Sequence, residues 1–211
     1  MDERTWTKRI SEILEEHFKE KTKQTFHVET EQKLPYGTVI TGFDENWKSE
    51  YAEKENMFAT DLVIYEEQGG RIIPRVVIEA KFKNAGTHDA MTYGKKAVLH
   101  RSLMPALRYG LMIGAMEDRD LQWRFFEHGG DFDFMFCFKG EEPDEKEKTS
   151  FIKLVDSEIK SSKNLEDMFG SKHTKSGIYC LQKELKLYRE TRMASSTNSN
   201  QNGEARSCVS G

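Results

Sequence analysis

Long hydrophobic runs are absent from this 211-residue sequence. No run reaches the roughly 18 apolar residues that a membrane-spanning helix requires. The opening Met1-Asp2-Glu3-Arg4 is mostly charged, so we expect no secretory signal peptide. Cysteine is also scarce, with 3 widely spaced residues. This spacing predicts neither a disulfide framework nor a zinc site, and it is typical of a protein in a reducing cytoplasm.

The sequence also lacks an excess of positive charge. Its 36 acidic residues outnumber its 32 lysines and arginines, giving a formal net charge of −4. Affinity for nucleic acid comes largely from Lys and Arg, so this balance disfavours a nucleic-acid binder, although a local basic patch stays possible. Length and composition predict one domain over residues 1–190. Residues 191–211 are rich in Ser, Asn and Gly, and we expect a disordered tail there.

Hydrophobic periodicity predicts alternating helices and strands. Apolar residues at spacings of three and four predict helices at 4–21, at 149–169, and from Thr87 towards Pro105. Short apolar runs predict strands at 26–28, 61–65, 72–82, 110–116, 123–126 and 132–138. Residues 34–37 are typical of a turn, 44–56 stay unassigned, and 178–188 fit either strand or helix. The order predicts a mixed α/β domain with a central sheet and helices packed outside it.

Three charged residues occupy places where charge is costly. Asp61 opens one predicted strand, and Glu79 and Lys81 close the next, which is strongly apolar. A buried strand normally excludes charge unless it is paired or bound to metal. Glu79 and Lys81 are two residues apart, so they share a face of the strand. A hairpin centred on Gly70 would place Asp61 directly opposite Glu79, because residue 70 lies midway between them.

These residue types suit metal-assisted hydrolysis of a phosphodiester. Mg²⁺ prefers oxygen ligands and commonly uses only one or two protein carboxylates. Asp61 and Glu79 are the candidate ligands, with the backbone carbonyl of Ala80 as a third. Lys81 is the candidate to orient the attacking water or to stabilise charge in the transition state. The alternative is a structural ion-pair cluster of the same side chains in a non-catalytic binding or assembly module.

With Asp61 on one strand and Glu79-Ala80-Lys81 on the next, followed by a helix, the sequence resembles the PD-(D/E)XK nuclease superfamily, especially type II restriction endonucleases. The pattern covers about residues 1–116 and departs at Thr60, where the family motif has proline. The resemblance implies a restriction-endonuclease-like αβββαβ core, with a central mixed sheet flanked by helices. It implies a Mg²⁺-dependent endonuclease, with Mn²⁺ able to substitute, that cleaves double-stranded DNA as a homodimer.

The resemblance also suggests further site residues. In some members an acid of the first helix joins the metal ligands, and Glu16 ranks ahead of Glu12 here. Candidates for contacts to the DNA backbone are Lys83, His88, Lys95 and Lys96. Candidates for contacts to base edges are Asn46, Trp47 and Tyr51. A solvated surface is the alternative for the basic residues, and loop anchoring is the alternative for the aromatic ones. A repair or mobile-element nuclease of the same fold is a further functional alternative.

Overall fold

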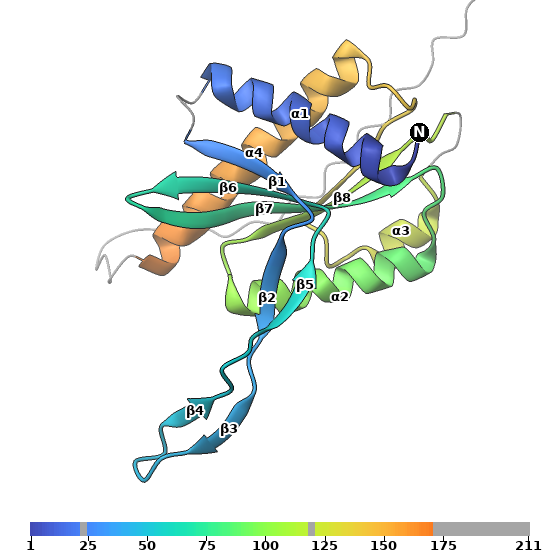
Figure 1. Ribbon diagram of the computed structural model, residues 1–211. Coiled ribbons are helices and arrows are strands. Elements are labelled where there is room, and N and C mark those ends of the chain that lie inside the picture. The colour runs from blue at the N-terminus through green and yellow to red at the C-terminus, as the bar shows by residue number, and fades with distance from the viewer. Residues whose placement is uncertain (22–24, 118–120, 171–211) are drawn as a thin grey trace, which may run out of the picture. The chain divides into compact units, whose positions relative to one another are not determined.

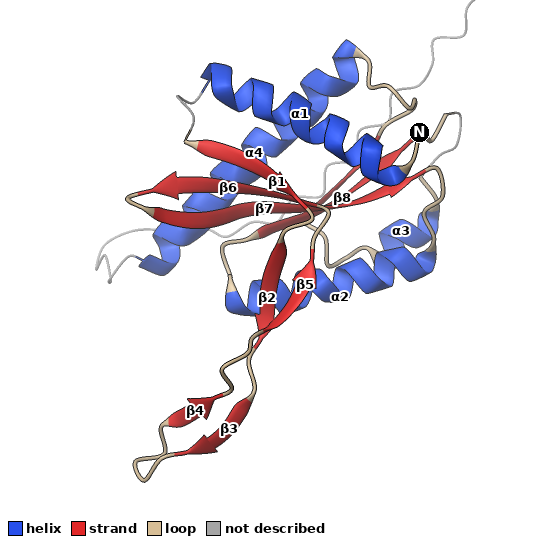
Figure 2. Cartoon of the chain, viewed as in Figure 1, coloured by secondary structure: helices blue, strands red, loops and turns tan. Residues whose placement is uncertain are grey.

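A five-stranded sheet with helices against both faces forms the centre of the computed structural model (Figures 1 and 2). The structure describes residues 1–21, 25–117 and 121–170. The predicted domain end at 190, the predicted tail at 191–211 and the ambiguous segment 178–188 lie outside these ranges. Among the described helices, none has the length and apolarity needed to cross a membrane.

The order of the elements confirms the predicted mixed α/β class. The helices are α1 (Glu3–Lys21), α2 (Thr87–Leu103), α3 (Trp123–His128) and α4 (Glu145–Gly170). The strands are β1 (Phe26–Thr30), β2 (Lys33–Gly37), β3 (Ile40–Phe43), β4 (Ser49–Tyr51), β5 (Asn56–Ala59), β6 (Leu62–Gln68), β7 (Arg71–Phe82), β8 (Arg108–Gly114) and β9 (Phe134–Cys137). The order α1, β1, β6, β7, α2, β8 matches the expected αβββαβ core, with β2 to β5 inserted after its first strand.

The sheet has the order β1-β6-β7-β8-β9 and is mixed. β1, β6 and β7 are antiparallel neighbours, whereas β7, β8 and β9 run parallel. α1 and α4 pack on one face, around a core that includes Trp6, Ile78 and Phe151. α2 and α3 cover the other face, where Val77 and Leu111 are buried. Alternate residues of β7 therefore face two different hydrophobic cores.

The β6–β7 hairpin contains an irregularity that matters for the site. Gly69 and Gly70 form its two-residue turn, with φ of 58° and 77°, the left-handed values that glycine adopts without strain. Beyond the turn, Tyr65 pairs with Pro74 and Ile64 pairs with Val76, so Arg75 is an extra residue on β7. This β-bulge shifts the register by one residue. Beyond it, each residue of β6 pairs with the β7 residue one position later than it would without the bulge, so it lies beside side chains of the opposite face.

Two local predictions from the sequence are wrong. Residues 34–37 are strand β2 rather than a turn, because Leu34 pairs with Phe58 of β5 and packs into the core under α2. Residues 123–126 belong to helix α3 rather than to a strand. Phe125 is 1% exposed there, whereas Trp123 is 72% exposed. A short apolar run does not distinguish a strand from one helical turn with a single buried side chain.

The unassigned polar stretch at 44–56 lies in a long two-stranded arm. β2 pairs with β5, and β3 pairs with β4 farther out, so the chain from 33 to 59 runs away from the sheet and returns (Figure 1). In the sequence the arm is inserted between β1 and β6. It ends close to Asp61, the residue that directly precedes β6.

Candidate functional site

Glu79 lies near the carboxyl end of β7 and faces α2, on the same side of the sheet as Val77. Its side chain is 0% exposed, so its charge is held inside an apolar layer. The register after the bulge pairs Leu62 with Ile78. Extending that register by one residue places Asp61 opposite Glu79, as the sequence predicts. Without Arg75, Asp61 would instead lie opposite Ile78 and face the other core.

Two donor groups make three contacts with the buried carboxylate of Glu79. The Tyr109 hydroxyl donates to Oε1 at 2.5 Å, and Lys96 Nζ lies 3.2 Å from Oε1 and 3.3 Å from Oε2. Burial raises the pKa of Glu79 to about 7, against the opposing effect of Lys96 and with a further increase from the Asp61 carboxylate. Glu79 therefore titrates near neutral pH.

Asp61 is half-buried just before β6. Its Oδ2 accepts a hydrogen bond from the backbone N–H of Ala80 at 2.7 Å. This bond fixes the Asp61 carboxylate against the strand that carries Glu79. After the larger effects of burial and Lys96, the Asp61 carboxylate contributes to the raised pKa of Glu79. The Ala80 side chain points to the opposite face, into the core under α1.

Lys81 lies beside two acids that belong to other elements of the fold. Its Nζ is 3.4 Å from Glu3 Oε1 and 3.6 Å from Asp89 Oδ1, and it lies 5.4 Å from the centre of the Tyr93 ring. Burial lowers the pKa of Lys81, but Tyr93 and the two acids more than offset this effect, so the pKa is above its usual value. Lys81 is therefore a cation at neutral pH, suited to stabilising negative charge rather than to accepting a proton.

The two carboxylates of the site, Asp61 and Glu79, fit a hard divalent cation. Among residues 1–21, 25–117 and 121–170, no group of three or more His, Cys, Asp or Glu side chains could hold a metal. Asp61 and Glu79 supply two carboxylates, which is the number that Mg²⁺ commonly takes from a protein alongside water. Burial and, to a smaller degree, repulsion from Asp61 raise the pKa of Glu79, and a bound cation would favour the ionised carboxylate. The donor set is thus compatible with Mg²⁺, while Lys96 already lies against one member of the pair.

The other predicted residues lie at different distances from this centre. Glu16 is exposed on α1, and the acid that α1 brings to Lys81 is Glu3, which also accepts the Phe82 N–H at 3.1 Å. Glu16 is thirteen positions after Glu3, which corresponds to about 20 Å along the helix. Lys96, a candidate for contact to the DNA backbone with a solvated surface as the alternative, pairs with Glu79 in this structure.

The remaining basic candidates are on the surface near the carboxyl end of β7 and along α2. Lys83 is exposed and pairs with Glu141 at 2.6 Å. His88 and Lys95 are exposed on α2. A hollow of about 360 Å³ opens just beyond the end of β7, with Lys83, Asp89 and Arg124 in its wall. Asp89 also contacts Lys81, so this hollow adjoins the site. It lies where the parallel strands β7 and β8 end, which is where ligands commonly bind in α/β sheets.

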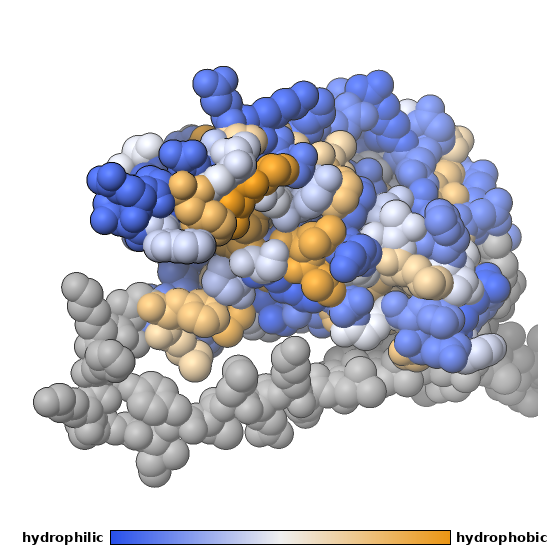
Figure 3. Space-filling view, turned by 90° about the horizontal axis from the view of Figure 1, so that it is seen from below, coloured by the Kyte–Doolittle hydropathy of each residue, from blue (hydrophilic) through white to orange (hydrophobic). Residues whose placement is uncertain are grey.

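Asn46, Trp47 and Tyr51 lie on the arm. Trp47 is 81% exposed and Tyr51 60% exposed. Figure 3 views the molecule from the side to which the arm points in Figure 1, and it shows apolar patches among hydrophilic surface. Residues 33–59 contain five acids and three lysines, so the arm is acidic. That balance disfavours contact with DNA phosphates, and the predicted base contacts stay predictions.

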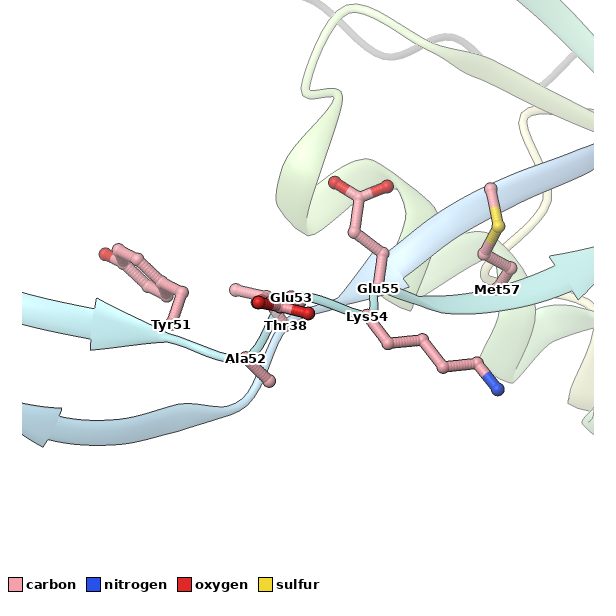
Figure 4. Close-up of a pocket in the computed structure, with 7 residues that line it drawn as sticks. All are labelled: Thr38, Tyr51, Ala52, Glu53, Lys54, Glu55 and Met57. Atoms are coloured by element: carbon pink, nitrogen blue, oxygen red, sulfur yellow. The ribbon is translucent and has the colours of Figure 1, made fainter.

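A further hollow in the described part of the chain is on this arm rather than at the carboxylates. It measures about 680 Å³ and is lined by residues that include Tyr51, Lys54, Glu55 and Met57. Figure 4 shows the Lys54 and Glu55 side chains pointing to opposite sides of the ribbon. A binding site requires polar groups that converge, so we assign the chemistry to the carboxylates and not to this open surface.

Sequence reasoning missed Tyr109, Glu3, Asp89 and Tyr93. Tyr109 stands opposite Val77 in the parallel β7–β8 pair, a contact that depends on how α2 returns the chain to the sheet. Asp89 also accepts the N–H of Gly86 at 2.8 Å, which is a helix-capping contact. An acid three residues after a break was the one available signal for it.

Comparisons with known proteins add little to this geometry. No family model matches the chain. No curated protein matches it either. Among solved structures, the chain is similar to the pre-specific restriction endonuclease BsaWI in its complex with DNA, with a TM-score of 0.41 and 10% identity. The match covers 79% of this chain and 62% of that one, less than two thirds of its length. A likeness this distant carries no argument about family, activity or partners.

Proposed function

We propose that this protein is a Mg²⁺-dependent endonuclease that hydrolyses phosphodiester bonds of double-stranded DNA. The observation that carries the proposal is the bulged hairpin, which brings Asp61 across from Glu79 while Lys81 follows on the same face of β7. Two oxygen ligands and one ammonium group are the side chains that such a reaction needs from the protein.

Each residue has a distinct role in this proposal. Asp61 and Glu79 hold the ion, with the Ala80 carbonyl as a candidate third ligand. When bound, a divalent ion supplies an activated water and polarises the phosphate. Lys81 stabilises the negative charge that develops on the phosphate oxygens, consistent with its raised pKa. Glu3 and Asp89 hold the Lys81 ammonium in position from two sides.

Basic residues on the surface around this centre support the proposed DNA substrate. Lys83, His88 and Lys95 are exposed beside the carboxyl end of β7 and along α2, where they could contact a phosphate backbone. A restriction enzyme acting as a homodimer in the cytoplasm is the specific form that we propose. Mn²⁺ is expected to replace Mg²⁺, since both accept oxygen ligands in octahedral geometry.

DNA cleavage by matched variants tests the proposal. Plasmid DNA is incubated with Mg²⁺ and the wild-type protein, Glu79→Gln or Glu67→Gln. The last removes an exposed carboxylate from the adjacent strand β6. We expect cleavage by the wild type and by Glu67→Gln, and a loss of about a hundredfold or more in Glu79→Gln. Equal cleavage by all three would remove Glu79 from the mechanism. Linear duplex, branched and single-stranded substrates separate a restriction enzyme from a repair or mobile-element nuclease.

A non-catalytic module is the second candidate, and one contact favours it. Lys96 already pairs with Glu79, so the carboxylate has a counter-ion within the protein. If the cluster is purely structural, Mn²⁺ and Ca²⁺ should not change the melting temperature. If the carboxylates bind an ion in the native state only, the melting temperature should rise with ion concentration.

A further inference from the structure

Lys96 reaches the centre of the site from the helix that covers it. Its Nζ lies 3.2 Å and 3.3 Å from the two carboxylate oxygens of Glu79 and donates to the Ala59 carbonyl at 2.9 Å. It also lies 5.0 Å from the centre of the Tyr93 ring. The Lys96 side chain is 18% exposed, so its aliphatic part is largely covered. One ammonium thus contacts three oxygen atoms from two segments of chain.

This arrangement resembles the coordination of a cation. Carboxylate and backbone carbonyl oxygens are the atoms with which proteins surround hard metal ions. Both oxygens of Glu79 are engaged by Lys96, and Oε1 also accepts the Tyr109 hydroxyl. Because Glu79 is 0% exposed, solvent does not separate a bound ion from this ammonium. Two positive charges on one buried carboxylate repel each other strongly.

We propose that Lys96 is an internal counter-cation that holds Glu79 until a divalent ion displaces it. This inference rests on the proposed function, because it assumes that Glu79 is a metal ligand. In the metal-free protein Lys96 neutralises the carboxylate and keeps the buried charge paired. Metal binding moves the ammonium away from Glu79. Lys96 is therefore a positioning residue that weakens metal binding.

Displacement also has a consequence for substrate binding. Lys96 is partly exposed and shares the face of α2 that lies over Glu79 and near Tyr93, the ring that Lys81 also contacts. Once released, its ammonium adds a positive charge beside Lys81. A polyanionic substrate would gain that charge when the metal is bound. The arrangement couples the two binding events, so that each strengthens the other.

Metal binding measured without catalysis tests this inference. Mn²⁺ is titrated calorimetrically into the wild type, Lys96→Met and Lys95→Met at about pH 8.5, where protons compete little for the ligands. Lys95 is the matched control, since it is the preceding residue of the same helix and is exposed. We expect Lys96→Met to bind Mn²⁺ about tenfold more tightly than the wild type, the low end for a close buried charge pair. Lys95→Met should change the affinity by about twofold at most.

The outcomes separate this inference from the proposed function. Mn²⁺ binding that is unchanged or weaker in Lys96→Met would overturn the counter-cation role and leave the metal site in place. Absence of Mn²⁺ binding in every variant would overturn both. If Lys96→Met does not fold, Lys96→Gln replaces it, because glutamine keeps a donor for Ala59 and Glu79 without the charge. Tighter binding in Lys96→Gln supports the proposal, and unchanged binding refutes it.

Discussion

Replacing Glu79 with glutamine tests the energetic cost of burying this carboxylate. Glu79 is the only acidic residue of β7 and is 0% exposed. Burial raises its pKa from an ordinary value of 4.5 to about 7. Between these two pH values the unfolded chain has lost the Glu79 proton while the folded chain keeps it. The unfolded state then binds fewer protons, so the free energy of unfolding falls as the pH rises.

The size of the effect follows from the shift in pKa. Each pKa unit corresponds to about 1.4 kcal/mol, so this group lowers the free energy of unfolding by about 3 kcal/mol above pH 7. Glutamine does not titrate. The stability of Glu79→Gln relative to the wild type should therefore increase by about 3 kcal/mol from about pH 4 to about pH 8. Lost hydrogen bonds add an offset that does not depend on pH.

Urea unfolding across this pH range, with a metal chelator present, measures the difference. Glu67→Gln on β6 controls for the removal of one negative charge from an exposed site. A constant difference between Glu79→Gln and the wild type would refute the raised pKa. A difference that shrinks as the pH rises would show that Lys96 and Tyr109 stabilise the ionised carboxylate more than burial destabilises it.

Two further predictions concern the sheet and can share the same urea assay. Gly110→Ala should lower the free energy of unfolding by about 1–3 kcal/mol, because a Cβ there would lie 2.2 Å from a phenylalanine ring of β9. Gly37→Ala is its control, with no atom within 4 Å of the added carbon, and an equal loss in both would contradict the packing argument. Arg75→Met should cost about 3 kcal/mol, because it removes the guanidinium that donates at 2.7 Å to Glu66, which is 7% exposed. Arg71→Met, at an exposed position of the same strand, should be nearly neutral.

The hairpin shows how far sequence reasoning reaches. The Gly69-Gly70 turn and the two flanking apolar runs were sufficient to predict β6, β7 and their antiparallel pairing. The predicted centre at residue 70 agrees with the register near the site, although the turn itself lies between Gly69 and Gly70. The bulge at Arg75 accounts for the difference. Pro74, directly before Arg75, is a local sign of this bulge, because proline within a paired strand removes a hydrogen bond of the ladder. The contact of the buried Arg75 with Glu66 depends on tertiary packing.

The partners of Glu79 were beyond local reasoning for a different reason. Lys96 falls outside the apolar stripe of its helix, which is typical of a solvated residue. A lysine stem, however, can lie along an apolar surface and carry its ammonium several ångströms away. Tyr109 reaches Glu79 through the parallel β7–β8 pairing, which is set by the crossover through α2. Both contacts depend on tertiary geometry rather than on the sequence near Glu79.

The balance of charge in the site bears on the choice between a metal centre and a structural cluster. The charged side chains of the site are four carboxylates and two ammonium groups: Asp61, Glu79, Glu3, Asp89, Lys81 and Lys96. With Glu79 ionised, four negative and two positive charges leave a net charge of −2, which one divalent cation would neutralise. In a structural cluster without a cation, the net charge is reduced to −1 only while Glu79 keeps its proton, below about pH 7. Above that pH the protein would carry the full cost of the buried charge, and a bound cation would offset it.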